Sequence, residues 1–210
     1  MVHAIEKLTI IPIIKLWVKK INGLEDIPKD RNFILSANHS SYMDHLILSS
    51  IIITKLNKRV YYLAKKEHFE TPFQKRWHEH VGAIPIDRQA GGKEALKTAV
   101  KYLKNKKIIG VYPEGTRTLT GNLQRGKTGA ARLVLAAKVP VLPVGLIGTF
   151  EVLPKGKNIP RFKRVVVNIG KLMYFDKYYG MENDKKTLRL VTTKVMKEIA
   201  KLTGKEYNFD

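Results

Sequence analysis

The chain has no cysteine among its 210 residues, which excludes disulfide bonds, thiolate metal ligands and cysteine nucleophiles. It also has no recognisable set of zinc ligands, no internal repeat and no low-complexity segment. A hydrophobic content of 44% over this length is enough for one domain with a sizeable core and hardly enough for two. We therefore expect a single domain stabilised by its own apolar packing, with no metal.

Acidic residues are few. The sequence has 18 Asp plus Glu against 39 Lys plus Arg, which gives a formal net charge of +21. Such a field attracts polyanions, whether nucleic acid, an anionic membrane or a phosphorylated small molecule. The basic residues are dispersed, with short clusters at 19–20, 65–66 and 104–107, and none forms the long basic arm of a nucleic-acid-binding tail. Because no nucleic-acid motif is present either, we expect no nucleic-acid partner and favour an anionic membrane surface.

The N-terminal segment lacks the run of about 20 apolar residues that a bilayer-spanning helix needs. Its longest uncharged piece, Leu8 to Ile14, is far shorter. Residues 4–21 are nevertheless amphipathic and include Trp17, while Pro12 predicts a kink or a helix that starts near it. Two interpretations are open: a helix at the membrane interface, or a helix that packs on the domain. We favour the interfacial helix for residues 1–21, because a basic, tryptophan-bearing amphipathic helix has the composition for it.

Beyond this segment, apolar strand patterns alternate with helical ones. Strands are predicted at 32–37, 59–65, 82–88, 108–112, 139–147 and 164–169, and helices at 43–55, 67–80, 93–104, 128–138 and 184–202. Pro140 and Pro143 favour an edge position or an irregular start for their strand. The last helix should be capped by Asp184 and end at Gly204. The alternation predicts an α/β domain with a mixed, mostly parallel sheet flanked by helices, over residues 22–210.

One stretch between the first strand and its helix carries a candidate catalytic pair. His39 and Asp44 are five residues apart, so they can touch only if His39 lies in a loop and the helix starts between them. Ser40 or Ser41 could cap that helix. A neutral imidazole can take a proton near pH 7, and a carboxylate can fix its tautomer and stabilise the imidazolium. A surface pair with no catalytic role is the alternative.

Four blocks of residues, taken together, closely resemble the lysophosphatidic acid acyltransferase family, the 1-acyl-glycerol-3-phosphate acyltransferases. They are Asn38 to Asp44, which has the His-x4-Asp motif, Gly82 to Arg88, Tyr112 to Arg117, and Val139 to Val144. The order and spacing of the blocks fit, and the resemblance covers roughly residues 22–204. Tyr112 stands where the family often has Phe. Many members also begin with clear transmembrane helices, which this chain lacks.

The resemblance implies a reaction: transfer of a fatty acyl group from acyl-CoA or acidic acyl carrier protein to the sn-2 hydroxyl of lysophosphatidic acid, giving phosphatidic acid in phospholipid biosynthesis. His39 matches the general base, and Asp44 matches the residue that orients it. No cofactor is implied, because the thioester is already activated. The resemblance and the charged N-terminal segment together imply a catalytic domain held at the cytoplasmic face of the cell membrane, as a peripheral or monotopic protein.

The remaining motif residues suit the phosphate of the substrate, which favours guanidinium groups, backbone amides and hydroxyls. Arg117, Thr116 and the amide of Gly115 offer all three, and Arg88 could supply a second guanidinium. We expect Glu114 to hold Arg117 or Arg88 in place, or to bond a substrate hydroxyl. The alternatives are an ordinary turn after a strand at residues 114–117 and a salt bridge from Arg88 to its neighbour Asp87.

Two other functions remain open from sequence. The same motifs could act on another acceptor, such as glycerol 3-phosphate or another lysophospholipid. A non-catalytic basic module that binds membranes or nucleic acid would explain the charge, but not why the motif residues fall at strand ends. Lys127 and Gly129 also fit the family's pattern, without a clear role.

Overall fold

The computed structural model describes residues 4–86 and 92–209, and its centre is a seven-stranded sheet in the order β1-β7-β6-β2-β5-β3-β4. The strands are β1 (Val18–Asn22), β2 (Ile34–Ala37), β3 (Val60–Lys65), β4 (Ala83–Ile86), β5 (Ile108–Val111), β6 (Val141–Ile147) and β7 (Val165–Ile169). Neighbouring strands pair in parallel, except β6 with β7, which are antiparallel. The expected mixed, mostly parallel sheet is therefore confirmed.

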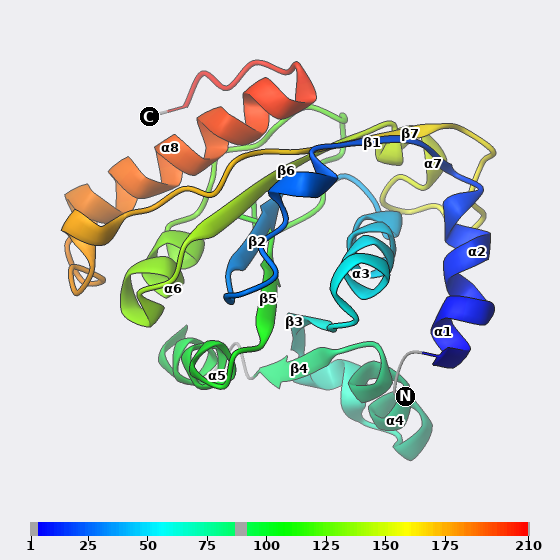
Figure 1. The fold of residues 1–210 in the computed structure, drawn as a ribbon, viewed down its shortest axis with the longest axis horizontal. Helices are drawn as coiled ribbons and strands as arrows, with labels where there is room; N and C mark the ends of the chain where they lie inside the picture. Colours follow the sequence, from blue (N-terminus) through cyan, green and yellow to red (C-terminus); the bar gives the residue numbers. More distant parts are fainter. Residues whose placement is uncertain (1–3, 87–91, 210) are drawn as a thin grey trace.

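Helices cover both faces of the sheet (Figure 1). One face carries α5 (Gly92–Lys104), α6 (Gly129–Ala137) and α8 (Lys185–Thr203), and the other carries α2 (Ile10–Lys15), α3 (Met43–Leu56) and α7 (Thr149–Val152). Successive residues of β2 show why the strand is apolar throughout: Ile34 packs in the α5–α6–α8 cluster and Leu35 in the α3 cluster. A strand buried on both faces reads as a continuous apolar run.

The chain leaves two adjacent strands toward opposite faces of the sheet. After β2 it continues into α3 on one face, and after β5 it runs through residues 112–128 to α6 on the other. β2 and β5 are parallel neighbours, so their carboxyl ends lie side by side. In open α/β sheets such a switch point leaves a crevice where ligands bind. The first and third sequence blocks meet at this point.

The N-terminal segment differs from its prediction. It forms two short helices, α1 (Ala4–Leu8) and α2, and Pro12 lies in the first turn of α2, which confirms a helix start near this proline. However, the helix ends at Lys15, and residues 18–22 are strand β1. β1 pairs with β7 and gives partners to backbone groups at that sheet edge, so the amphipathic helix does not reach residue 21.

The two prolines of β6 do not place it at an edge: β6 lies between β7 and β2. The expected irregular start is confirmed, because Pro140 precedes the strand, with its carbonyl accepting a hydrogen bond from the Ile34 amide. Pro143 is tolerated inside because its backbone faces the end of β7. At that position the Gly170 amide donates a hydrogen bond to the Pro143 carbonyl, at 2.9 Å. The pairing between the two strands therefore does not need the backbone N–H that proline lacks.

The predicted helix over residues 67–80 is split into a 3-10 turn, η2 (Lys66–Phe69), and α4 (Pro72–His80). Pro72 begins the second helix, and Thr71 caps it through a reciprocal pair of bonds with Gln74. The structure assigns no buried residue to α4. This helix therefore projects from the sheet and leaves its aromatic side chains exposed.

The C-terminal helix α8 has the caps that its sequence predicts. The Asp184 carboxylate accepts a hydrogen bond from the Thr187 amide at 2.8 Å, and Gly204 ends the helix with a φ of 67°. Hydrogen bonds from Thr187 hold the pKa of the Asp184 carboxyl below its ordinary value. A depressed carboxyl pKa contributes stability that is complete above the unfolded-state pKa of about 3.9 and is lost as the pH falls through the folded-state value.

We therefore expect Asp184→Ala to lower the melting temperature at pH 7, with a gap to the wild type that narrows between about pH 5 and pH 3. Asp184→Asn keeps a capping oxygen without the charge, so it should melt above the alanine variant. Thermal unfolding followed by circular dichroism across this pH range measures both effects. A gap between wild type and Asp184→Ala that is as wide at pH 3 as at pH 7 would contradict the role of the charge.

Candidate active site

His39 and Asp44 form the expected pair. His39 lies in the loop after β2 and Asp44 is the second residue of α3, with 2.8 Å between His39 Nδ1 and Asp44 Oδ2. The carboxylate can only accept, so Nδ1 carries the hydrogen and Nε2 keeps a free lone pair. The Asp44 side chain is fully buried and that of His39 is 19% exposed. The imidazole is thus held on one edge and reachable on the other.

The loop around the pair is folded onto one carboxylate oxygen. Asp44 Oδ2 also accepts hydrogen bonds from the backbone amides of Ser40, at 2.7 Å, and Ser41, at 2.8 Å. A carboxylate in the first turn of a helix is further stabilised by the helix dipole. Tyr42 holds the N-cap position, but the Ser41 hydroxyl accepts from the first helical amide, Met43, at 3.0 Å. Of the two serines considered, Ser41 therefore does the capping.

Glu114 joins the second loop to the first. Its Oε1 accepts from the His39 amide at 2.7 Å, and its Oε2 accepts from the Gln124 amide at 2.9 Å and from the Gln124 side chain at 3.2 Å. The Thr118 amide donates to the His39 carbonyl at 2.9 Å, so the His39 backbone is held on both sides. Burial raises the pKa of Glu114, and these donors oppose the rise. Of the three roles considered for Glu114, a bond to Arg117 is not found among the described residues, because its bonds go to His39 and Gln124. A bond to Arg88 would lie outside the described residues, and a bond to a substrate hydroxyl stays a prediction.

Gly115 has a structural role in the turn rather than the expected one. Its amide donates to the Tyr112 carbonyl at 2.9 Å, so this amide is not free for a phosphate. Its φ of 73° is one that residues with a Cβ rarely adopt, and a Cβ here would lie 2.9 Å from Lys127 Cδ. The absence of a side chain therefore lets Lys127 lie along the turn. Thr116 is exposed on the same turn.

Arg117 stacks on a residue that the sequence analysis did not single out. Its guanidinium carbon lies 3.3 Å from the ring centroid of Tyr42, which belongs to the first block. Arg117 Nη1 is buried and has no hydrogen-bond partner in the described part of the chain. A buried guanidinium nitrogen without a partner is suited to an anionic ligand. Arg88 lies outside the described residues.

The arrangement provides a proton acceptor, His39 Nε2, within a loop that also carries the stacking partner of Arg117. Lys127 adds a second cationic side chain beside the same turn. In residues 4–86 and 92–209, no group of three or more His, Asp or Glu side chains could hold a metal ion. Chemically, these side chains can take a proton from a hydroxyl and bind an anionic group next to it.

Comparisons with known proteins agree with this reading. The pattern of the family described as "Acyltransferase" matches residues 19–147. The chain is 33% identical over 139 residues to the 1-acyl-sn-glycerol-3-phosphate acyltransferase of Bacillus subtilis (strain 168), covering 66% of this chain and 68% of the relative. It is 30% identical over 167 residues to the enzyme of the same name from Borreliella burgdorferi, covering 77% and 62%. It spans only 45% of the chloroplast relative from Brassica napus, at 30% identity.

A solved structure is similar over almost the whole chain. The crystal structure of the 1-acyl-sn-glycerophosphate acyltransferase PlsC from Thermotoga maritima matches with a TM-score of 0.70 and 27% identity, covering 96% of this chain and 83% of that one. Both the sequence and the fold therefore lead to one conclusion: the chain belongs to the 1-acyl-sn-glycerol-3-phosphate acyltransferase family.

Proposed function

We propose that this chain transfers a fatty acyl group from a thioester donor, acyl-CoA or acyl carrier protein, to the sn-2 hydroxyl of 1-acyl-sn-glycerol 3-phosphate, giving phosphatidic acid. The observation that carries the proposal is the His39–Asp44 pair, with Nδ1 bound to the carboxylate and Nε2 free. The names of the relatives support this acceptor. The names of the relatives do not specify the acyl donor, so the choice of donor is our own addition to the proposal.

The reaction balances with these residues alone. His39 Nε2 takes the proton from the acceptor hydroxyl while the hydroxyl oxygen attacks the thioester carbonyl. The carbon–sulfur bond of the thioester then breaks. The imidazolium then returns the proton to the departing thiolate. Asp44 stabilises the imidazolium through Nδ1, and a well-placed base of this kind contributes about 10²–10⁴-fold. No cofactor enters the scheme, because the thioester is already activated.

The phosphate of the acceptor binds Arg117. Its unpartnered Nη1 offers a donor, and stacking on Tyr42 limits how the guanidinium can turn. Lys127, whose side chain lies against Gly115 of the same turn, supplies a second positive charge. Glycerol 3-phosphate and other lysophospholipids carry the same group, so the acceptor's tail must distinguish them. An acceptor panel that compares these three compounds tests that part.

The catalytic pair gives a direct test of the proposal. His39→Ala should abolish the release of free thiol from acyl-CoA in the presence of 1-acyl-sn-glycerol 3-phosphate, because no base remains. Asp44→Asn should be severely impaired but less so, because the tautomer is no longer fixed. Melting temperatures show whether each variant is folded. Full activity in a folded His39→Ala protein would refute the mechanism.

The phosphate assignment predicts a change in affinity rather than in turnover. Arg117→Lys should raise the acceptor KM by about 10-fold or more, since an ammonium cannot reproduce a bidentate guanidinium contact. Lys138→Arg, at the far end of α6, is a control that should leave the acceptor KM unchanged. If Arg117→Lys raises only the donor KM, Arg117 binds the donor instead.

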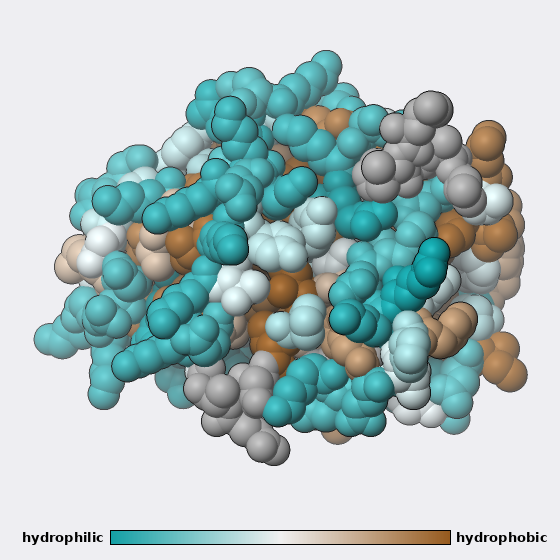
Figure 2. All heavy atoms as spheres, turned by 90° about the horizontal axis from the view of Figure 1, so that it is seen from below, coloured by the Kyte–Doolittle hydropathy of each residue, from teal (hydrophilic) through white to brown (hydrophobic). Residues whose placement is uncertain are grey.

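Attachment to a lipid surface is part of the same proposal, because acceptor and product are lipids. No helix in the described residues is long and apolar enough to cross a membrane. In α1–α2, Ile11 and Ile14 are buried against the domain, whereas Leu8, Ile13 and Leu16 are more than half exposed. One side of the segment therefore packs on the domain, and the other side faces outward, where it is available for the interfacial contact that we propose. Apolar residues gather on the side where Figure 1 places these helices (Figure 2).

A neighbouring loop extends this apolar patch. Phe162 is 70% exposed and contacts Trp17, with 6.3 Å between ring centroids, and Ile159 is 82% exposed. The same loop carries five exposed cationic residues: Lys155, Lys157, Arg161, Lys163 and Arg164. Apolar side chains surrounded by cations have the chemistry of an anionic lipid surface. The net charge of +21 adds an attraction that salt screens over roughly 8–10 Å.

The membrane proposal predicts two separable parts of binding. The triple variant Leu8→Ser, Ile13→Ser and Leu16→Ser should bind anionic vesicles more weakly than the wild type at every salt concentration, and high salt should weaken both. Deleting the segment is a poor test, because it would also remove β1 from the sheet. Leu190→Ser on α8 serves as an exposed control on the opposite face.

Co-sedimentation with anionic and neutral vesicles across a salt series measures this, with activity on detergent-dispersed acceptor as the check on the active site. The triple variant should keep that activity. Normal vesicle binding by the triple variant, with loss in Phe73→Ser/Trp77→Ser, would place the contact on α4 and contradict the proposal.

A further inference from the structure

Aromatic rings from three elements form a stack behind the catalytic imidazole. The rings of His39 and Tyr112 are nearly parallel, 3.9 Å apart between centroids and inclined by 11°. Tyr112 is in turn parallel to Tyr62 of β3, at 6.0 Å and 9°. His45 of α3 closes the stack with its ring at 71° to Tyr62 and 6.1 Å away. One face of the His39 ring is therefore covered by Tyr112.

Gly110 makes room for this stack. It pairs with Tyr62 in the β3–β5 register and lies two residues before Tyr112 on β5. A Cβ at Gly110 would lie 2.2 Å from Cε1 of Tyr62 and 2.7 Å from two further atoms of the same ring. The Tyr62 ring lies across the glycine, on the same side of the sheet as Tyr112. Any side chain at position 110 would displace it.

The rings that support His39 are uncharged near pH 7. The hydroxyls of Tyr62 and Tyr112 are buried and lie close enough to each other to affect each other's pKa. Burial raises the pKa of both, so both stay protonated. Burial also lowers the pKa of His45 to about 4, so this imidazole is neutral near pH 7. The faces of the rings, not their polar atoms, are what the stack presents to His39.

We propose that Tyr112, supported by Tyr62 across Gly110, is a positioning residue that fixes the plane of the His39 imidazole and stabilises its protonated form during acyl transfer. The bond from Nδ1 to Asp44 holds one edge of the ring but permits rotation about that bond. The Tyr112 face removes this freedom, so that Nε2 points in a single direction. A positively charged ring over an aromatic face is also favourable, and more so where water is excluded.

This inference rests on the proposed function, in which His39 is the base. Tyr112 contacts neither the acceptor's phosphate site at Arg117 nor the Asp44 carboxylate through any hydrogen bond in the described residues. Its loss should consequently affect turnover rather than acceptor affinity. A misplacement of a catalytic group by about 1 Å can cost about 100-fold in rate.

The test compares four variants by kcat and acceptor KM in the thiol-release assay. Tyr112→Leu should lower kcat by about 10- to 100-fold with an acceptor KM within about twofold of the wild type. Tyr112→Phe restores the ring and should recover most of kcat. Gly110→Ala should lower kcat without touching His39 directly, since it displaces Tyr62. Tyr61→Leu is the matched control.

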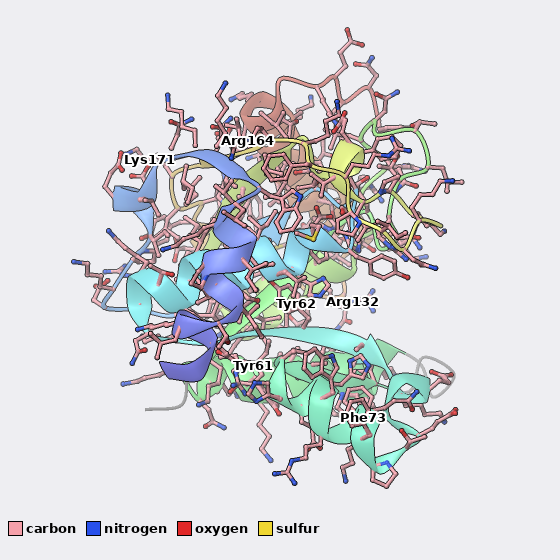
Figure 3. All side chains as sticks on the ribbon, turned by 90° about the vertical axis from the view of Figure 1, so that its right-hand side faces the viewer. Tyr61, Tyr62, Phe73, Arg132, Arg164 and Lys171 are labelled. Atoms are coloured by element: carbon pink, nitrogen blue, oxygen red, sulfur yellow. The ribbon has the colours of Figure 1, made fainter. Side chains whose placement is uncertain are left out.

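Tyr61 suits this purpose because it neighbours Tyr62 on β3 but lies on the opposite side of the strand (Figure 3). It packs edge-on against Tyr102, with 5.0 Å between centroids, in the α5–α6–α8 cluster. Its loss should lower stability without changing kcat. A fall in kcat for Tyr61→Leu equal to that for Tyr112→Leu would mean that general loosening of the sheet is responsible, which overturns the proposal.

Histidine-selective ¹⁵N NMR of the resting protein separates this inference from the proposed function. The wild type should show His39 as one sharp signal protonated at Nδ1. Tyr112→Leu should keep the Nδ1 proton, which Asp44 holds, but its His39 signal should be broadened by motion of the ring, and Tyr112→Phe should resemble the wild type. An inactive wild type with this NMR pattern would refute the proposed reaction but not the positioning. An unchanged His39 signal and normal kcat in Tyr112→Leu, or a Tyr112→Phe variant as impaired as Tyr112→Leu, would overturn the positioning.

Discussion

A buried carboxylate needs hydrogen-bond donors, and all three donors to Asp44 converge on one oxygen, Oδ2, while Oδ1 is buried without a partner among the described residues. Oδ2 accepts from the imidazole and from two successive backbone amides, so the loop after β2 must wind around it. The same three bonds start α3 and set the tautomer of His39. Folding of this corner and orientation of the base therefore depend on the same hydrogen bonds.

Glu114 plays a complementary part from the neighbouring strand. It binds the His39 backbone rather than its ring, so Asp44 sets the direction of the side chain while Glu114 sets where the residue sits. The two carboxylates reach His39 from loops that leave the sheet toward opposite faces. The parallel pairing of β2 with β5 is what brings these loops together, so the geometry of the site follows from the strand order.

The sequence was informative where the signal is local. Short apolar runs predicted β2 and β5, helical patterns predicted α3 and α8, and the spacing of His39 and Asp44 predicted a loop followed by a helix. What failed depends on partners far along the chain. Val18 to Asn22 alternates too weakly to be recognised as a strand without β7 beside it, and Pro143 looks unsuited to an inner strand until Gly170 is seen opposite.

Within the site, the contact between His39 and Asp44 is the expected one, whereas several other contacts differ from the expectation. The sequence did not indicate that Glu114 would bond to Gln124, ten positions on, instead of Arg117, three positions on. That contact depends on how residues 115–123 fold back toward Glu114. The amide of Gly115 bonds to the Tyr112 carbonyl within its own turn, so it cannot bind a phosphate. Tyr42, which was not expected to take part, stacks against Arg117. Such contacts arise from tertiary geometry, which motif spacing does not encode.

The pairing of β1 with β7 has a consequence for how the chain is made. Val18 lies opposite Val165, so β1 has no partner in the sheet until synthesis of the chain has reached β7. Pairing two strands that are this far apart in the chain is slow, because the intervening segment loses conformational entropy before the stabilising contacts form. During that interval α1 and α2 are tethered to an undocked strand, with their apolar residues open to chaperones or to lipid before the domain itself is complete.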